Sequence, residues 1–170
     1  MNDARLPRFF YIFLVFLGLV MAAYYYPRMP ERMASHFAGD GRPNGWQPRE
    51  AFFLTMLLGS ASSALVAFFA PWRIASQPNA RINLPNRDYW LASERRAQTM
   101  NYISAFMGWF GCAVLFVLIS GTFLAFQANL APGHHFNSQA LLVVLVAFLL
   151  FLLVGLIRFL RHFQNDISET

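Results

Sequence analysis

Four long apolar runs, none of which contains a formal charge, constrain the fold of this chain more than any other feature. They cover residues 9–26, 51–72, 102–126 and 140–157. About 20 apolar residues in a helix, each rising about 1.5 Å, cross a hydrocarbon core of roughly 30 Å. We therefore predict an all-α integral membrane protein with four transmembrane helices, folded as a single membrane domain over residues 1–170.

The amino-acid composition agrees with a membrane location and argues against a nucleic-acid partner. Of the 170 residues, 57% are hydrophobic and only 12% are charged, too few to cover a soluble globule. The 13 basic residues are all arginines, and they stand at the ends of the apolar runs instead of forming one patch or stripe. The single cysteine, Cys112, lies inside the third run, so an intrachain disulfide bond is excluded.

The distribution of arginines predicts the orientation in the bilayer. An even number of spans places both termini on one side of the membrane, and the first and third connections on the other. Because cytoplasmic loops carry an excess of positive charge, both termini are expected in the cytoplasm and the first connection outside. The terminal side has Arg5, Arg8, Arg73, Arg81, Arg87, Arg95, Arg96, Arg158 and Arg161, and the opposite side has only Arg28, Arg32, Arg42 and Arg49.

Small residues predict which helices pack most closely, because helices in lipid associate through close backbone approach. The second run contains the small-residue segment 59–64, and the third has Ala105, Gly108, Gly111 and Cys112 at spacings of three and four. These two helices are predicted to make the tightest contact. The fourth run consists mainly of large aliphatic residues and Phe, which suits a helix that faces lipid or a partner.

The polar first connection, residues 26–50, is rich in proline and glycine and is predicted to be structured. Pro27 ends the first helix near Tyr26, and Pro30 suits the first position of a short helical turn. The segment 42–45, Arg-Pro-Asn-Gly, is typical of a tight turn, because proline presets one torsion and Asn and Gly tolerate the left-handed region. We expect a shaped cap between the first two helices.

Histidines on the predicted outer face raise the possibility of a metal site. Neutral imidazole and carboxylate groups can bind Zn²⁺ or Cu²⁺. The ligands are scattered over two connections without a compact spacing, so the favoured interpretation has no cofactor, with His36 hydrogen-bonded inside its own loop. A metal-binding membrane protein or metalloenzyme is the alternative. The candidate ligands are His36, Asp40, His134 and His135.

Catalysis and ion transport have no support in the sequence. No glycine-flanked serine, phosphate-binding glycine loop or pair of carboxylates accompanies His36. The four apolar runs contain no ionisable Asp, Glu, Lys, Arg or His, which pumps and secondary transporters need at membrane depth. We therefore expect a protein that is not an enzyme.

The first connection also contains a spaced pattern that points to a family. A helix ends in Tyr-Pro, a second proline follows, and then come a His-Phe pair, a glycine turn and a basic residue before the next helix. In this pattern the chain resembles, over about residues 9–72, the bacterial domain of unknown function that forms the N-terminal part of SdpI-type toxin-immunity membrane proteins. The matching positions are Tyr26, Pro27, Met29, Pro30, His36, Phe37, Gly41, Pro43, Asn44 and Arg49.

The resemblance implies a multi-pass protein of the bacterial cytoplasmic (inner) membrane, and it assigns no catalytic residue. Ala34 stands where the family often has proline, and only two further spans follow the family-like part. Eight of the matching positions are our candidate binding residues. They are Tyr26, Pro27, Pro30, His36, Phe37, Gly41, Asn44 and Arg49.

These observations lead to one functional hypothesis and two alternatives. We expect a non-catalytic binding, immunity-like or sensory protein, embedded in the lipid bilayer, whose outer face recognises a partner. That face consists of residues 26–50 and 127–137, and the partner is a protein or peptide in or on the membrane, or a lipid headgroup. The alternatives are the metal-dependent protein and an accessory subunit that contacts a larger complex through its fourth helix. The pattern assigns no oligomeric state.

Overall fold

The computed structural model describes residues 3–165, and it confirms the predicted all-α membrane class while adding a small two-stranded sheet. Within these residues, four helical stretches are long and apolar enough to cross a membrane: Arg5–Arg28, Arg49–Ala75, Ser93–Leu130 and Ser138–Gln164. The elements in chain order are α1 (Arg5–Tyr25), η1 (Tyr26–Arg28), β1 (Arg32–Phe37), β2 (Pro43–Pro48), α2 (Arg49–Ala64), η2 (Leu65–Phe69), α3 (Ala70–Ala75), η3 (Asn79–Arg81), α4 (Arg87–Trp90), α5 (Ser93–Leu130), η4 (Pro132–His134) and α6 (Ser138–Asn165).

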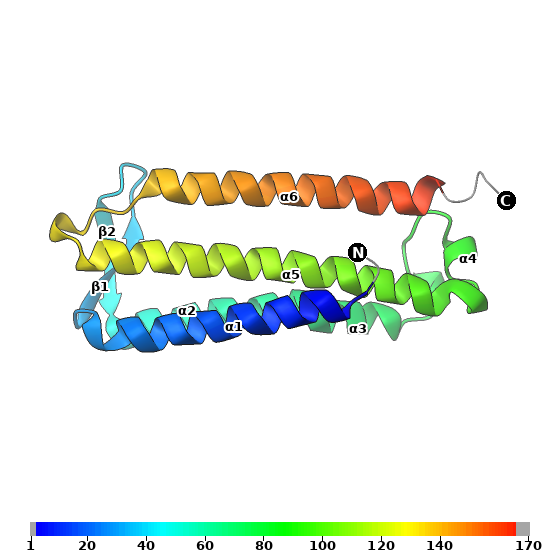
Figure 1. Cartoon of the computed structure of the whole chain (residues 1–170), viewed down its shortest axis with the longest axis horizontal. Helices are drawn as coiled ribbons and strands as arrows, with labels where there is room; N and C mark the ends of the chain where they lie inside the picture. The colour runs from blue at the N-terminus through cyan, green and yellow to red at the C-terminus, as the bar shows by residue number, and fades with distance from the viewer. Residues whose placement is uncertain (1–2, 166–170) are drawn as a thin grey trace.

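The four long helical stretches run side by side, with α5 in the centre (Figure 1). Helices α1 and α2 pack on one side of α5, and α6 lies on the other. The β1–β2 hairpin and the connection between α5 and α6 lie at one end of the molecule, which we call the hairpin end. Helices α3 and α4, the start of α1 and the end of α6 lie toward the opposite end, which we call the terminal end. The start of α1 and the end of α6 thus lie toward the same end of the molecule, whereas the side of the membrane that this end faces stays a prediction.

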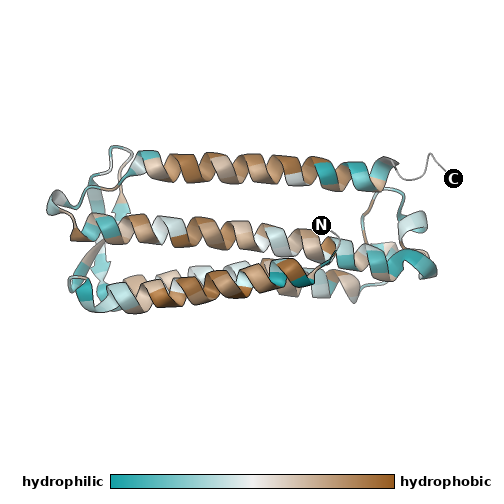
Figure 2. Ribbon diagram, viewed as in Figure 1, coloured by the Kyte–Doolittle hydropathy of each residue, from teal (hydrophilic) through white to brown (hydrophobic). Residues whose placement is uncertain are grey.

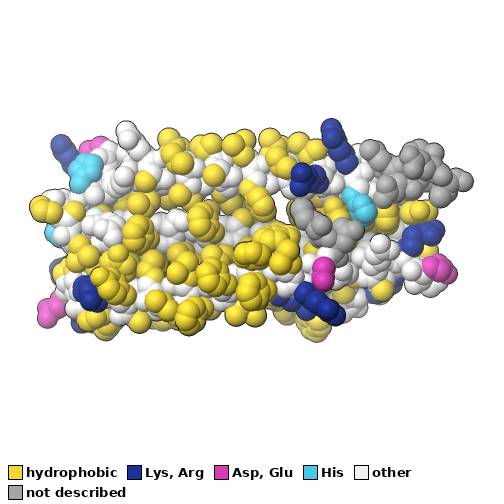
Figure 3. All heavy atoms as spheres, viewed as in Figure 1, with side chains coloured by type: hydrophobic (Ala, Val, Ile, Leu, Met, Phe, Trp, Pro, Cys, Tyr) yellow, Lys and Arg dark blue, Asp and Glu magenta, His cyan; other side chains and the backbone are white. Residues whose placement is uncertain are grey.

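Hydropathy follows the long axis of the molecule. The middle of each long helix is hydrophobic, whereas the hairpin and the region around α4 are mostly hydrophilic (Figure 2). Charged and histidine side chains gather at the two ends of the visible face, with hydrophobic side chains between them (Figure 3). This distribution is the one expected of a protein that spans a bilayer.

The central position of α5 depends on its small residues. A Cβ atom added to Gly111 would lie 2.5 Å from the Cβ atom of Ala67 in η2, and one added to Gly108 would lie 3.0 Å from Pro7 in α1. The predicted close contact between the second and third spans is therefore present at Gly111, whereas Gly108 faces the first span. Gly59, from the predicted small-residue segment, has nothing within 4 Å of an added Cβ atom, so this glycine does not lie at a helix contact.

The second span contains a π-helical turn, η2, that the apolar run did not reveal. Pro71 has no N–H group, so it cannot donate the usual helical hydrogen bond to the carbonyl group of Ala67. Just before it, the N–H group of Ala70 donates instead to the carbonyl oxygen of Leu65, five residues back. The turn places Ala67 against Gly111 of α5.

We expect Gly111→Ala to lower the free energy of unfolding by about 1–3 kcal/mol, because the new methyl group must displace the backbone of η2. Gly59→Ala is the matched control, since it adds the same methyl group in the same membrane region without a neighbour. Thermal unfolding of the two variants in one detergent measures the difference. Equal melting temperatures would contradict the proposed contact.

Candidate functional site

The first connection is structured, as predicted, and it takes the form of an antiparallel β hairpin, which the sequence did not reveal. Strands β1 and β2 pair with Met33 opposite Gln47 and Ala34 opposite Trp46. The helical turn predicted from Pro30 is wrong: a 3₁₀ turn lies earlier, at Tyr26–Arg28, and β1 begins at Arg32. We call residues 26–50 and 127–137 together the hairpin cap.

The tight turn of the hairpin lies at residues 38–42, so the turn predicted at residues 42–45 is also wrong. The N–H group of Ala38 donates to the carbonyl oxygen of Arg42 (2.8 Å), and that of Gly41 donates to Ala38 (2.8 Å). The carboxylate of Asp40 accepts a hydrogen bond from the Arg42 N–H group (3.1 Å). Gly41 adopts a φ of 86°, which glycine reaches without the steric cost that other residues have. Pro43, Asn44 and Gly45 therefore belong to β2.

Two irregularities shift the pairing of the strands and then restore it. Ser35 is an extra residue in β1, between the pairs Ala34–Trp46 and His36–Gly45, and Asn44 is an extra residue in β2. The side chain of Asn44 meets the imidazole of His36, with its Oδ1 atom against Nδ1. Both side chains are exposed. This contact gives His36 a partner on the opposite strand.

Asn129, near the end of α5, binds the hairpin directly. Its Oδ1 atom accepts a hydrogen bond from the N–H group of Ala34 (2.7 Å), and its Nδ2 atom donates to the carbonyl oxygens of Ala34 and Ala125 (both 2.9 Å). Asn129 is 4% exposed and Ala34 is fully buried. The side-chain amide therefore pairs with the backbone of β1 as a neighbouring strand would.

Sequence reasoning missed Asn129 because the predicted third span ended at residue 126. A signal was present: Ala125, Phe126 and Ala128 continue the apolar helix to Leu130, so Asn129 lies within a helix and not in a solvated connection. An asparagine at such a position needs partners for its amide, because an unpaired buried amide costs free energy.

The connection between α5 and α6 supplies a second attachment of the hairpin. The N–H group of Phe136 donates to the carbonyl oxygen of Gly41 (2.9 Å), and the ring of Phe136 stacks on that of Phe37 at 4.8 Å between centroids. A Cβ atom at residue 41 would collide with the carbonyl oxygen of Phe136, and it would lie 2.6 Å from the imidazole of His135. Gly41 is thus required both by its torsion angle and by this close approach.

An aromatic core lies beneath the hairpin. Phe126 of α5 is fully buried, and its ring stacks on Tyr25 (4.8 Å) and on Phe53 (5.2 Å). The fully buried Met33 of β1 joins the same core. The hairpin is therefore packed onto the ends of α1, α2 and α5 and does not project freely into solvent.

The remaining candidate residues of the family-like pattern mostly shape the junctions between the hairpin and the helices. Pro27 lies in η1, and Pro30 follows it in the exposed segment before β1. The guanidinium group of Arg49 lies over the ring of Tyr26 at 4.6 Å, and it donates to the carbonyl oxygen of Met29 (3.3 Å). These contacts fix the start of α2 against the end of α1.

The four candidate metal ligands do not form a ligand set. Over residues 3–165, no group of three or more His, Cys, Asp or Glu side chains lies close enough together to hold a metal ion. Asp40 forms an exposed ion pair with Arg42 (3.5 Å). His134 has a φ of 54° and its ring meets that of Trp46 edge-on at 5.1 Å, whereas His135 is exposed beside Gly41. The arrangement of these four residues therefore gives no structural support to the metal-binding alternative.

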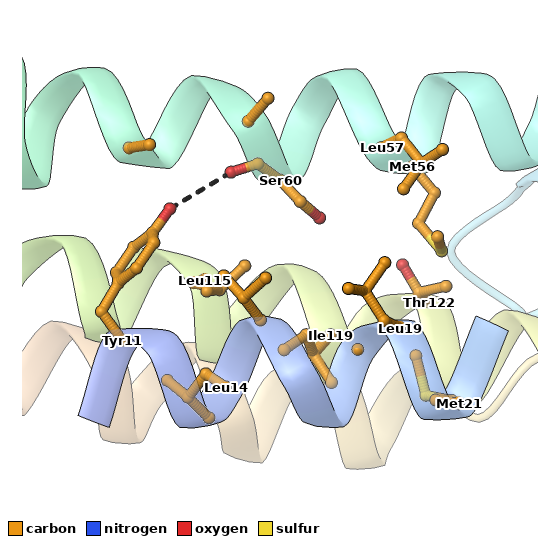
Figure 4. Close-up of a pocket in the computed structure, with 14 residues that line it drawn as sticks. Tyr11, Leu14, Leu19, Met21, Met56, Leu57, Ser60, Leu115, Ile119 and Thr122 are labelled. Atoms are coloured by element: carbon orange, nitrogen blue, oxygen red, sulfur yellow. Dashed lines mark hydrogen bonds between the residues drawn. The ribbon is translucent and has the colours of Figure 1, made fainter. Parts of the chain in front are cut away.

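A second candidate site is an apolar cavity of about 230 Å³ between α1 and α2, with α5 as its floor (Figure 4). Tyr11 lies at one end of it, where its hydroxyl group lies 2.6 Å from the Ser63 hydroxyl group and 3.5 Å from the carbonyl oxygen of Ser60. Apart from Ser60 and Thr122, the other lining residues are apolar, Leu115 and Ile119 among them. The cavity offers apolar contact and no charged group for chemistry.

These features define a multi-pass membrane protein with a hairpin cap anchored at one end of its helices. Residues 13–59, from within α1 through the hairpin into α2, match the model of a family described as a domain of unknown function (DUF1648). The match falls within the part of the chain for which the sequence pattern predicted such a domain. No curated protein and no solved structure matches the chain.

We expect Asn129→Leu to loosen the hairpin from α5. The substitution leaves the N–H and carbonyl groups of Ala34 buried without partners, at about 1–3 kcal/mol each. Limited trypsin digestion should then cut faster after Arg32, at the start of β1, as measured by mass spectrometry of the fragments. Gln127→Ala is the control, because it removes an exposed amide from the same helix end, where Gln127 donates to the Tyr25 hydroxyl group. Equal cleavage of both variants would contradict the anchoring role of Asn129.

Proposed function

We propose that this chain is a non-catalytic binding protein of a bacterial cytoplasmic membrane. In this proposal the hairpin cap lies on the outer face of the membrane and recognises a protein or peptide partner in or on the membrane. Both termini lie in the cytoplasm in this proposal. The arginine distribution supports this orientation, because nine of the 13 arginines lie on the terminal side of the predicted spans. The family match over residues 13–59 includes the whole hairpin.

One observation supports recognition above all: an exposed tryptophan lies on a strand whose partner is anchored to a membrane helix. Trp46 is 42% exposed and lies directly opposite Ala34, the residue that Asn129 holds. Along β2, the side chains of Asn44, Trp46 and Pro48 are exposed, and those between them are half-buried. Tryptophan is enriched among the residues that dominate binding energy, and a rigid surface loses less entropy on binding.

The polar groups of the cap favour binding over catalysis in this proposal. The His36 imidazole contacts Asn44, the Asp40 carboxylate pairs with Arg42, and the Arg49 guanidinium group contacts Tyr26 and Met29. These groups thus pair with one another in the cap. A nucleophile–base pair aimed at a cavity, which catalysis would require, is absent from this set of contacts.

The resemblance to immunity proteins supports a peptide as the partner. A secreted peptide reaches a membrane protein from outside the cell, and the proposed orientation places the hairpin cap on that side. Arg28, Arg32 and Arg42 are exposed there, so the cap suits a peptide with acidic or aromatic side chains.

To test recognition by the cap, the protein is cross-linked in its native membrane, purified in mild detergent and quantified with its partners by mass spectrometry. We expect Trp46→Ala to reduce recovery of the partner on the order of tenfold or more. Trp72→Ala is the matched control, since Trp72 is 60% exposed at the terminal end. If Trp46→Ala keeps the wild-type melting temperature and recovers as much partner as the wild-type protein, the hairpin cap is not the recognition surface.

The immunity-like role has a separate test. Deletion of the gene should sensitise the host cell to a secreted peptide, and expression of the wild-type protein should restore resistance, whereas Trp46→Ala should not. Growth inhibition by secreted peptide fractions measures the effect. Identical sensitivity of the deletion strain and the parent would refute immunity while leaving recognition of another partner to the cross-linking experiment.

A further inference from the structure

Helix α6 stands apart from α1 and leaves an apolar groove between them. Figure 1 shows the two helices on opposite sides of α5, and α6 packs chiefly against α5. Two cavities of about 570 and 360 Å³ lie along this groove, and Val144 of α6 lines both of them. The two cavities therefore lie end to end along the groove and meet at Val144, with α5 as their floor.

The dimensions of the groove suit a lipid chain. On α1 its lining extends from Phe10 to Tyr25, which at about 1.5 Å per residue is roughly 20 Å of helix. One leaflet contributes about half of a hydrocarbon core of roughly 30 Å, so an extended acyl chain fits within the groove. Each cavity also lies in the range of about 300–1,000 Å³ typical of ligand sites.

The chemistry of the groove changes from apolar to cationic at the hairpin end. No charged residue lines either cavity, and the lining is almost entirely aliphatic and aromatic. Tyr24 lines the groove near the hairpin end, and the guanidinium group of Arg28 lies over its ring at 3.8 Å. Arg28 is exposed, and none of the ion pairs formed within residues 3–165 includes it. The guanidinium group also donates to the backbone carbonyl oxygen of Tyr24, so an exposed cation is held beside the apolar mouth of the groove.

We propose that the groove between α1, α5 and α6 binds one anionic glycerophospholipid from the leaflet on the hairpin side. One acyl chain lies along α5, past Val144, and the phosphate lies at the mouth against Arg28. The cation at headgroup level favours a lipid over an apolar partner helix, because the lipid brings a phosphate that can pair with this cation and the helix does not. The bound lipid fills the space between α1 and α6 and so stabilises the position of α6.

Native mass spectrometry tests this lipid site with dioleoyl phosphatidylglycerol as the probe and dioleoyl phosphatidylcholine as the competitor. We expect one phosphatidylglycerol to remain on the wild-type protein. Val144→Trp fills the place where the two cavities meet, so the acyl chain loses its apolar contact there. We expect this loss to lower the affinity for the lipid, and hence its retention, about tenfold or more. Val143→Trp is the matched control, since Val143 is the next residue, is 69% exposed and lines neither cavity.

Arg28→Gln tests the headgroup contact separately. It should lower the preference for phosphatidylglycerol over phosphatidylcholine about tenfold, the scale of one charge-assisted hydrogen bond. Ala140→Leu narrows the same groove with a side chain smaller than that of Trp. If Val144→Trp does not fold, lipid retention by Ala140→Leu takes its place in the test. Equal retention by the two Trp variants, or unchanged lipid preference in Arg28→Gln, would overturn the proposal and assign the lipid to the general bilayer around the helices.

Discussion

The two-way hydrogen bond between the Asn129 amide and the backbone of Ala34 is the interaction on which the hairpin end of this molecule depends. A two-stranded hairpin is at best marginally stable in water, because half of its backbone groups face outward without partners. Asn129 satisfies two of these groups with one side chain, at a buried site beside an aromatic core. Phe136 then fixes the turn through Gly41. The hairpin is consequently part of the helix bundle, although it lies at its end.

The features of the sequence that depend on length and local chemistry were predictable. The four spans follow from apolar runs long enough to cross a bilayer, and the end of α1 follows from Pro27. The hairpin was not predictable in this way. Its strands contain Pro43, Gly45 and Pro48, which disfavour strands locally, and its anchor lies 95 residues from Ala34 along the chain. Contacts of that range are set by the fold, which local patterns do not report.

The candidate site, too, could be predicted from the sequence only in part: the segment was apparent, and its contacts were not. The pattern of Tyr26, His36, Gly41 and Arg49 lies within the family match over residues 13–59, and the structure places these residues in the hairpin or at its junctions with α1 and α2. The contacts of these residues were not apparent from the sequence: His36 contacts Asn44 on the opposite strand. The turn lies at Gly41 and not at residues 42–45, since the torsion angle at residue 41 and the close approach of Phe136 both require glycine there. The family match ends at residue 59, before α5 begins. The matched segment therefore relies on a later helix for the anchor of its hairpin.

The paired irregularities at Ser35 and Asn44 have a consequence for how this hairpin can vary among related sequences. Each adds one residue to its strand, and the two offsets cancel, so Phe37 opposite Pro43 returns to the register of Ala34 opposite Trp46. Loss of one residue from either strand would turn the side chains beyond it to the other face of the sheet. Loss of one residue from each of the two strands would leave every remaining side chain on its present face of the sheet. Relatives of this chain should therefore change the length of their two strands together, and the outward position of Trp46 should survive such changes.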